Sequence, residues 1–331
     1  MSSTQSTPCL LVGDIGGTNA RFALADPNSS GFSQEKTFKC RDYESADVAI
    51  NAYLTETGAP QPSVICFAAA GPVVDGNVRF TNNDWNLETS RLETAFGGAT
   101  VSLLNDFEAI AYSIPHLKTD DCIQVGSPAP ADLTRPDFTI GSVGPGTGLG
   151  AAGLVMKKSV ACPIVGEGGH VGFAPETPIQ VELLAQMANQ FERVCDERFV
   201  SGPGLVNIYR ALGNIRGQNL NDLKAAEIFA LATENRDLIA QEALDIFFEV
   251  LGQVAGNLAL TLGAYDGVFI GGGIVARKPE LIIDSQFRTG FERKGRHRGL
   301  METIPTQVIV HRQPGLLGAS YCALQAHRGN F

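Results

Sequence analysis

The sequence has little positive charge: 25 lysines and arginines stand against 35 aspartates and glutamates, which gives a formal net charge of −10. Proteins that bind nucleic acid or an anionic membrane need a basic surface that faces the phosphates. Neither partner is therefore expected. A small phosphate-bearing ligand remains compatible with this acidity, because backbone N–H groups can hold an anion without basic side chains.

Paired cysteines and clustered histidines are also missing. The seven cysteines are scattered, odd in number and without a Cys-x-x-Cys pair, and the five histidines show no His-x-x-x-His spacing. Disulfide frameworks and zinc sites use such spacings, whereas scattered reduced thiols are typical of the cytosol. No basic segment followed by an apolar run stands near the N-terminus. The chain is therefore expected to be cytoplasmic.

The sequence also lacks an uninterrupted membrane span. Residues 250–276 are mostly apolar, carry one charge, Asp266, and have the length of a span. Gln253, Asn257 and several glycines interrupt the stretch. We expect a buried helix followed by a strand, and no membrane association.

What is present is an alternation of short apolar runs and helical periodicity, which indicates an α/β protein. At 331 residues the chain exceeds one typical domain, so two are expected. Strands are predicted at 9–13, 21–25, 63–69, 100–104, 138–141, 149–156, 266–270 and 307–311. Helices are predicted at 45–57, 87–95, 106–113, 178–190, 204–212, 223–232, 236–262 and 315–326, with a surface loop at 127–136.

Two glycine-rich turns, at residues 13–18 and 144–150, each join a predicted pair of strands, and Gly17-Thr18 aligns with Gly146-Thr147. This internal echo predicts a duplicated α/β core with two phosphate-facing hairpins. Glycines let backbone N–H groups approach an anion closely. Asp14, at the end of a strand, could hold a water-shelled Mg²⁺. A plain tight hairpin whose aspartate caps the turn is an equally good interpretation.

Other nucleotide-binding motifs fit poorly. A formal Gly-x-Gly-x-x-Gly spans 148–153, but the dinucleotide fingerprint must open a helix, and this segment continues as a strand. No Gly-Lys dipeptide occurs, which excludes a P-loop. Two glycine hairpins without a P-loop lysine are the more specific signal.

Three further groups of polar residues are candidates for chemistry. Asp106 follows Asn105 where a strand meets a helix, so it is either a helix N-cap or a general base, or both if Asn105 does the capping. Glu167 and His170 lie in a glycine-rich loop that is not expected to be helical. They could bind adjacent sugar hydroxyls or simply form a surface turn. Trp85, the only tryptophan, is expected to be a packing anchor.

These motifs together resemble the bacterial glucokinase family of actin/hexokinase-like ATPases. The matching segments run in order along the chain: LVGDIGGTNARFAL, LLNDFEAIA, GPGTGLG, GEGGHVGFAP, SGPGLVNIYRA, GNLAL with GVFIGGGIV, and HRQPGLLG. The resemblance implies an ATP-dependent hexose kinase that makes glucose 6-phosphate for glycolysis. It also implies a two-domain actin-like/ribonuclease-H-like fold with the ligand cleft between the domains, here residues 1–110 with 315–331, and 111–314.

The resemblance also implies roles for individual residues. Asp106 would be the catalytic base, and Asp14 would contact Mg²⁺ through water. The sugar hydroxyls would be bound by Asn82, Asn105, Asp106, Glu167, His170 and Glu197. ATP would be held by Gly13, Asp14, Ile15, Gly16, Gly17, Thr18, Asn19, Gly144, Gly146, Thr147, Gly148, Gly271, Gly272 and Gly273.

Two departures from related families bear on cofactors. Related repressor/kinase families carry a cysteine-rich zinc loop after their Glu–Gly–His motif, and Gly172-Phe-Ala-Pro has no such cysteines, so zinc is not expected. Pro145 inside the second turn removes one N–H donor. The family also suggests a homodimer.

Rival functions remain open. A kinase of fructose or of an N-acetylated sugar would share this fold. A non-catalytic sugar or nucleotide sensor would be expected to add a DNA-binding helix-turn-helix, for which a fold that starts by Cys9 leaves no room. A dehydrogenase is disfavoured because a strand follows the glycines at 148–153.

Overall fold

The computed structural model describes residues 8–80 and 83–330, which form a mixed α/β structure. The chain divides into two compact units. Unit 1 comprises Met1–Leu117 and His311–Phe331, and unit 2 comprises Lys118–Val310. The domain division predicted at residues 110 and 314 stays a prediction.

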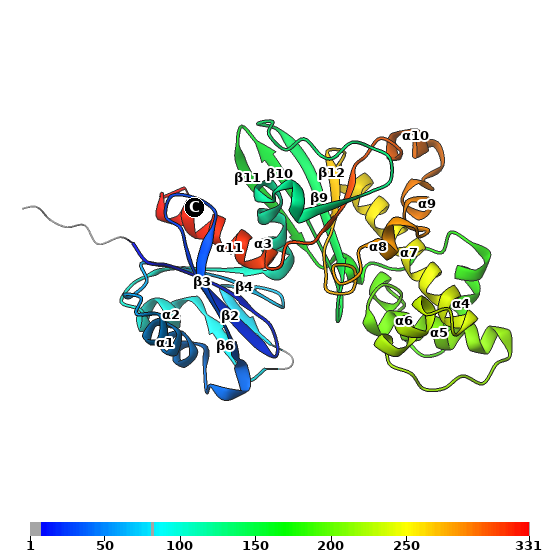
Figure 1. The fold of residues 1–331 in the computed structure, drawn as a ribbon, viewed down its shortest axis with the longest axis horizontal. Coiled ribbons are helices and arrows are strands. Elements are labelled where there is room, and N and C mark those ends of the chain that lie inside the picture. The colour runs from blue at the N-terminus through cyan, green and yellow to red at the C-terminus, as the bar shows by residue number, and fades with distance from the viewer. Residues whose placement is uncertain (1–7, 81–82, 331) are drawn as a thin grey trace, which may run out of the picture. The chain divides into compact units, whose positions relative to one another are not determined.

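Unit 1 is built on a five-stranded sheet in the order β3-β2-β1-β4-β7. The first three strands are antiparallel, whereas β1, β4 and β7 run parallel. Figure 1 shows the C-terminal helix α11 beside α3, with which it is in contact. The strands are β1 (Leu10–Ile15), β2 (Asn19–Ala25), β3 (Phe32–Lys39), β4 (Val64–Ala69) and β7 (Thr100–Asn105), beside a small ladder of β5 (Asn77–Arg79) and β6 (Asn86–Glu88). The helices are α1 (Ala46–Thr57), α2 (Thr89–Ala95), α3 (Asp106–Ser113) and α11 (Pro314–His327).

Close packing of α3 against α11 depends on a glycine. A Cβ at Gly318 would lie 1.8 Å from the carbonyl oxygen of Ala109, so only glycine lets the two backbones approach this closely. On the other face of the sheet the ring of Phe22 packs at tilted angles against the rings of Tyr53 and Phe67, with a centroid separation of 5.7 Å in each pair. This buried aromatic cluster joins β2, α1 and β4, and its Phe67 packs against Gly13 of β1, whose end carries the first glycine turn.

Unit 2 repeats the same strand pattern in its sheet, β11-β10-β9-β12-β13-β8. Again three antiparallel strands adjoin parallel ones, and β8 adds an antiparallel edge. The predicted duplication of the core is therefore confirmed. The strands are β8 (Cys122–Val125), β9 (Phe138–Pro145), β10 (Leu149–Lys157), β11 (Val160–Gly166), β12 (Gly267–Ile270) and β13 (Thr306–Ile309). The helices are α4 (Pro178–Ala188), α5 (Gly202–Arg216), α6 (Ala225–Thr233), α7 (Leu238–Leu262), α8 (Glu280–Ile283), α9 (Phe287–Glu292) and α10 (Arg298–Met301).

The apolar stretch 250–276 forms the end of α7 followed by β12, as predicted. Within the described residues α7 is the one helix long and apolar enough to cross a membrane, and 72% of its apolar window is buried inside the structure. It is therefore a core helix of unit 2. All seven cysteines are free thiols.

Several elements differ from the sequence prediction. Strand β3 was not predicted, because it is a sheet edge whose side chains are largely exposed and polar or mixed in character. Strand β11 was not predicted either: it is an exposed sheet edge, and its apolar sequence VACPIVG contains Pro163, which is unusual inside a strand. The short β5, β6 and β8 and the short helices α8, α9 and α10 were also missed. The helix predicted from 87 begins at Thr89, since 86–88 pairs with β5. The long helix begins at Leu238 because Asp237 is its N-cap, accepting from the N–H of Ala240 at 2.9 Å.

Candidate active site

The first glycine turn is a tight antiparallel hairpin between β1 and β2. Ile15 pairs with Ala20, and the N–H of Gly16 donates to the carbonyl of Asn19 at 2.9 Å. Thr18 stands exposed at the tip. Gly13 has a packing reason for being glycine, because a Cβ there would lie 2.8 Å from the ring of Phe67. The hairpin predicted from sequence is confirmed, and contact of these residues with ATP stays a prediction.

Asp14 lies beside two groups of positive charge, the guanidinium of Arg21 and the N-terminus of α11. Its Oδ2 lies 3.2 Å from Nη1 of Arg21, its register partner on β2. Its carboxylate also lies at the N-terminus of α11, where a Cβ on Gly315 would be 3.5 Å from the Asp14 Cγ, and a helix N-terminus favours negative charge. Burial raises the pKa of Asp14, and the Arg21 guanidinium acts in the opposite direction.

The donor set at Asp14 fits a loosely held Mg²⁺. No group of three or more metal-ligating side chains occurs among residues 8–80 and 83–330. Mg²⁺ commonly uses only one or two carboxylates, with nucleotide phosphates and water completing its shell. A single carboxylate at the end of β1 is compatible with that arrangement.

Asn105, rather than Asp106, is the N-cap of α3. Its Oδ1 accepts from the N–H of Phe107 at 2.9 Å, and its Nδ2 donates to the carbonyl of Gly71 at 3.0 Å. Glu108 completes the capping box through the N–H of Asn105. Asp106 is the first helical residue, and its Oδ1 also accepts from Phe107 N–H. Because Asn105 caps the helix, the carboxylate of Asp106 is not needed as the N-cap and can act as a base.

Strand register places both groups at one edge of the unit 1 sheet. Ile15 is level with Ala69 on the parallel strand β4, and Ala69 is level with Asn105 on β7. Since neighbouring strands are about 4.8 Å apart, the end of β1 and the start of α3 are separated by about 10 Å. The first hairpin and Asp106 therefore lie along the same edge.

Two other predictions in unit 1 have different outcomes. Trp85 is buried, and its Nε1 donates to the carbonyl of Tyr43 at 3.0 Å, so it is the packing anchor that the sequence indicated. Asn82, a predicted sugar ligand, lies outside the described residues.

In unit 2 the second glycine turn (144–150) packs backbone to backbone on the glycine segment 271–273. Pro145 pairs with Leu149 to form the hairpin, and Thr147 is exposed at its tip. A Cβ at Gly144 would lie 2.5 Å from the carbonyl carbon of Gly271. At Gly272, whose φ is +85°, a Cβ would lie 2.3 Å from the carbonyl oxygen of Pro145. These glycines are required by close approach of the two chain segments.

The two segments that carry the predicted sugar ligands of unit 2 both contact Leu149 of this hairpin. Glu197 Oε2 accepts from the N–H of Leu149 at 2.9 Å. A Cβ at Gly169, between Glu167 and His170, would lie 2.1 Å from the carbonyl oxygen of Leu149. The side chains of Glu167 and His170 are 60% and 56% exposed, with Oε2 and Nε2 3.9 Å apart. The backbone of this turn is held against Leu149 through Gly169, while the side chains of Glu167 and His170 are exposed and can bind a polyhydroxyl ligand.

The loop itself differs from expectation. Residues Gly168–His170 form a 3-10 turn, η4, closed by a bond from the N–H of His170 to the carbonyl of Glu167 at 3.0 Å. The N–H of Val171 adds a second i→i+3 bond to the carbonyl of Gly168 at 3.4 Å, and so short a 3-10 turn needs little helix propensity. Glu197 lies in a second such turn, η5 (Asp196–Arg198).

Sequence reasoning missed Asp196, next to Glu197. Its side chain is buried, and burial raises its pKa to about 7 while Lys294 acts to lower it. The signal that could have revealed it is weak, because an aspartate in a Cys-Asp-Glu-Arg run ordinarily indicates a solvated surface.

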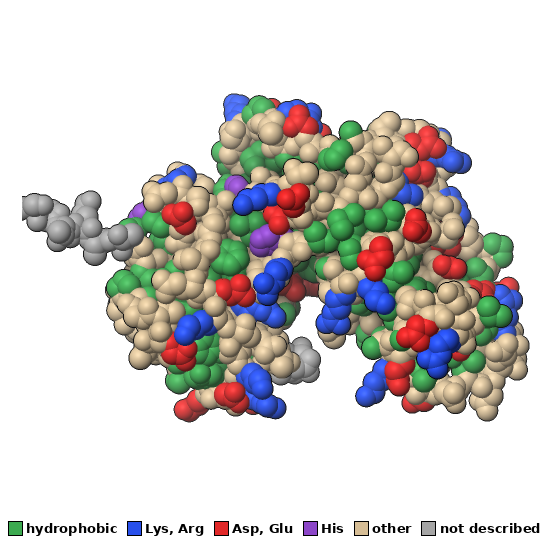
Figure 2. Space-filling view, in the orientation of Figure 1, with side chains coloured by type: hydrophobic (Ala, Val, Ile, Leu, Met, Phe, Trp, Pro, Cys, Tyr) green, Lys and Arg blue, Asp and Glu red, His purple; other side chains and the backbone are tan. Residues whose placement is uncertain are grey.

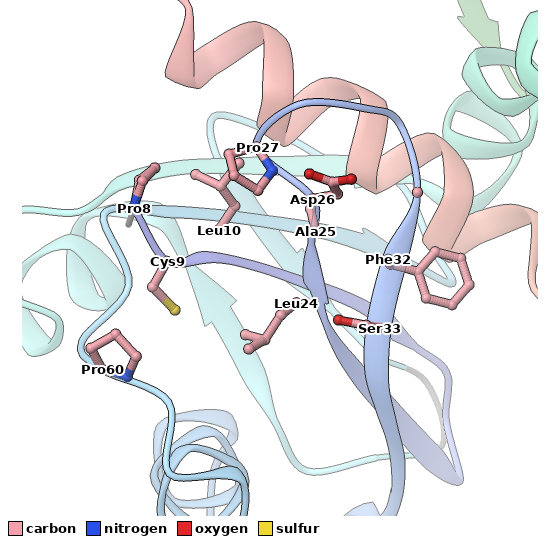
Figure 3. A pocket seen from close by; sticks show the side chains of 11 residues that line it. Pro8, Cys9, Leu10, Leu24, Ala25, Asp26, Pro27, Phe32, Ser33 and Pro60 are labelled. Atoms are coloured by element: carbon pink, nitrogen blue, oxygen red, sulfur yellow. The ribbon is translucent and has the colours of Figure 1, made fainter. Parts of the chain in front are cut away.

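Two hollows in the described part of unit 1 bear on the site. One, of about 910 Å³, adjoins the first hairpin and is lined by Gly17, Thr18, 39–44 and 83–85. The other, of about 470 Å³, lies at the opposite end of β1, with Cys9 and Pro60 on one side and Phe32 on the other (Figure 3). Asp26 in this second hollow already accepts from Asn28 N–H and Ser29 Oγ within its own turn. The first hollow is therefore the one associated with the candidate site.

Acidic and basic side chains are interspersed over the face that Figure 2 shows, where they form no extended basic patch.

Comparison with known proteins gives consistent matches. The sequence profile of the family Glucokinase matches residues 11–326. The glucokinase of Xanthomonas euvesicatoria pv. vesicatoria (strain 85-10) is 41% identical over 326 residues, covering 96% of each chain. The crystal structure of a glucokinase from an Antarctic psychrotroph has a TM-score of 0.87 at 33% identity and covers 96% of this chain and 99% of that one. A ROK family glucokinase from Streptomyces griseus, in complex with glucose and AMPPNP, shares the fold with a TM-score of 0.63 at 19% identity, covering 96% of this chain and 99% of that one.

Proposed function

The chain belongs to the glucokinase family, and from that premise we propose that it transfers the γ-phosphoryl group of ATP to glucose, with Asp106 as the general base. It has the α/β fold of the actin-like sugar kinases, as the sequence predicted. The observation that carries the activity is 41% identity to curated glucokinases over 96% of the chain. The product would be glucose 6-phosphate, which feeds glycolysis.

Asp106 is assigned to the proton transfer. The attacking hydroxyl must lose its proton as it bonds to phosphorus, and a positioned carboxylate can accept that proton. Support comes from the capping box, since Asn105 and Glu108 fix the first turn of α3 and hold the Asp106 backbone at the strand end. The hydrogen bond from Phe107 N–H to Asp106 Oδ1 further limits the rotation of the carboxylate.

The glycine hairpins are assigned to the nucleotide. Phosphoryl transfer passes through a loose transition state, so alignment and charge neutralisation contribute more than covalent chemistry. Residues 13–19 of unit 1 would bind the phosphates together with Gly144, Gly146, Thr147 and Gly148 of unit 2, and 271–273 would approach the adenosine. Mg²⁺, when bound with the nucleotide, would supply positive charge against the triphosphate, and Asp14 would hold it through water.

The sugar hydroxyls are assigned to Asn105, Glu167, His170 and Glu197, with Asn82 as a further candidate. Charged and amide groups make strong, directional bonds to hydroxyls, and such bonds discriminate strongly against analogues that lack a partner group. The exposure of Glu167 and His170 supports their assignment to a ligand instead of to packing.

Assembly and setting complete the proposal. A cytoplasmic setting is supported by the scattered free thiols, and zinc is not expected because the segment Gly172-Phe-Ala-Pro contains no cysteine. The homodimer is proposed from the family alone. Light scattering coupled to gel filtration would measure the assembly. A monomeric mass would contradict the dimer.

The experiment for the activity is a coupled ADP-release assay over glucose, fructose, mannose and N-acetylglucosamine. We expect the highest kcat/KM for glucose. A higher value for another hexose would assign the chain to the alternative kinase. Nucleotide binding without turnover of any hexose would favour the sensor.

A further inference from the structure

The tip of the second glycine hairpin is fastened to the segment that carries Glu197. Glu197 Oε2 accepts from Leu149 N–H at 2.9 Å on one side of the tip. On the other side the N–H of Gly202, the first residue of α5, donates to the carbonyl of Gly146 at 2.9 Å. Hence the shape of the hairpin is set by contacts with residues 197–202 as well as by its own strands.

We propose that Glu197 is a positioning residue that couples the two substrates: the carboxylate assigned to the sugar also fixes the backbone of the hairpin assigned to the ATP phosphates. The inference rests on the proposed function for both assignments. It adds a consequence that neither assignment contains, namely that glucose and nucleotide strengthen each other's binding through this contact.

The geometry makes Glu197 suited to this task. Its backbone is held by η5, and its carbonyl accepts from Ser201 Oγ at 2.8 Å, so the side chain extends from a fixed base. The neighbouring Arg198 is engaged elsewhere, since its guanidinium stacks on the ring of Phe191 at 4.1 Å. The Glu197 side chain itself is half-buried.

Gly148 shows how closely the carboxylate and the hairpin fit. A Cβ at Gly148 would lie 2.5 Å from Glu197 Oε2, which is shorter than van der Waals contact allows. Glycine at this position lets the carboxylate reach Leu149 N–H. The neighbouring carboxylate thereby gives a reason for glycine at this position of GPGTGLG, in addition to the proposed contact with phosphate.

Binding of the two ligands is coupled because each of them restricts the motion of the same hairpin. A sugar hydroxyl bound to Glu197 restricts the rotation of its carboxylate, and the carboxylate in turn restricts the hairpin through Leu149. A second ligand that needs the ordered hairpin then loses less conformational entropy on binding, which gives positive cooperativity. By linkage the effect is reciprocal, and typical couplings are about 5–150-fold in affinity.

Gly148→Ala is the most direct test. The added methyl group displaces the carboxylate, which is the flexible end of a side chain, so the fold is retained while the contact with Leu149 is broken. Gly166→Ala is the matched control, because a Cβ there meets nothing within 4 Å and Gly166 has no assigned ligand. A second pair compares Glu197→Ala with Glu197→Gln, which keeps an acceptor oxygen for Leu149 N–H.

Calorimetry measures the dissociation constant of a non-hydrolysable ATP analogue with Mg²⁺, with and without saturating glucose. In the wild type, Gly166→Ala and Glu197→Gln, glucose should tighten analogue binding by about fivefold or more. In Gly148→Ala and Glu197→Ala the ratio should fall towards one. Hydrogen exchange at Leu149 N–H should slow on glucose addition in the wild type and stay unchanged in Gly148→Ala.

Wild-type coupling in Gly148→Ala, or no glucose effect on the wild type, would overturn the inference. The assignment of Glu197 to the sugar is read separately, from glucose titrations without nucleotide. If Glu197→Ala leaves glucose affinity unchanged, the sugar assignment in the proposed function is wrong. If glucose affinity falls but the coupling ratio of Gly148→Ala stays at the wild-type value, the coupling alone is wrong.

Discussion

Glu108 closes a reciprocal cap on the residue beside the proposed base: its Oε2 accepts a hydrogen bond from the backbone N–H of Asn105 at 3.2 Å. The bond links the first turn of α3 to the end of β7. The position of Asp106 therefore depends on a side chain two residues further along the helix.

Loss of this cap should affect stability and catalysis together. Glu108→Ala should lower the free energy of unfolding by about 0.5–2 kcal/mol, the usual range for a helix cap, and should reduce kcat. Glu108→Gln keeps the acceptor and should stay close to the wild type. Urea unfolding and the ADP-release assay measure the two effects. If Glu108→Ala and Glu108→Gln had the same free energy of unfolding and the same kcat, the cap would not position Asp106.

The contact between α3 and α11 gives a second prediction. Gly318→Ala places a methyl group against the carbonyl of Ala109, and overpacking of this kind usually costs about 1–3 kcal/mol. Gly299→Ala in α10 is the control, since the space around its Cβ is empty, and it should be neutral or slightly stabilising. Thermal unfolding distinguishes them. Equal stability of the two variants would mean that α11 can move away without cost.

The polar turn of unit 2 gives a third prediction. Removing a hydrogen bond from a charged group to a ligand typically costs about 1.5–3 kcal/mol. Glu167→Ala should therefore raise the KM for glucose about tenfold or more, His170→Ala should act in the same direction, and the KM for ATP should change far less. Steady-state kinetics with each substrate varied will measure this. Equal changes in both constants, or none, would indicate a purely structural turn.

The raised pKa of Asp196 predicts that the stability of the fold depends on pH. Burial raises its pKa from 3.8 to about 7. The protonated carboxyl therefore stabilises the fold fully at pH values below the pKa that this aspartate has in the unfolded chain. This stabilisation is lost as the pH rises through about 7. Between about pH 5 and pH 8 the wild type should lose about 2–3 kcal/mol relative to Asp196→Asn, which cannot titrate.

Urea unfolding of both proteins at the two pH values will test the role of Asp196. Asp120→Asn, at an exposed position, should follow the wild type and serves as the control. Parallel pH profiles of the wild type and Asp196→Asn would show that Asp196 is not the group responsible.

Local patterns were enough to predict much of this fold. The bounds of α3 were predicted correctly, because a buried strand followed by Asn105, Asp106 and Glu108 carries its own start signal. The two glycine hairpins and the core helix α7 were equally local. The edge strands β3 and β11 were not predicted, since their exposed side chains carry little apolar alternation.

The reasons for particular glycines could not be predicted at all. Gly148, Gly169 and Gly318 each leave room for an atom from a segment distant in sequence, which local propensity does not encode. The buried position of Asp196 depends in the same way on tertiary packing. Such features arise from long-range contacts, and the structure was needed to find them.

The most direct test of the account is the turnover of Asp106→Asn. Asparagine keeps the size of the side chain and leaves the cap by Asn105 in place, so folding and glucose affinity should be retained. The variant can no longer accept the proton, and kcat should fall by about 10²–10⁴-fold. Glucose affinity by calorimetry and kcat by ADP release should be measured on the same preparation. Retention of more than about half of the wild-type kcat, far above that range, would contradict the assignment of Asp106 as the base.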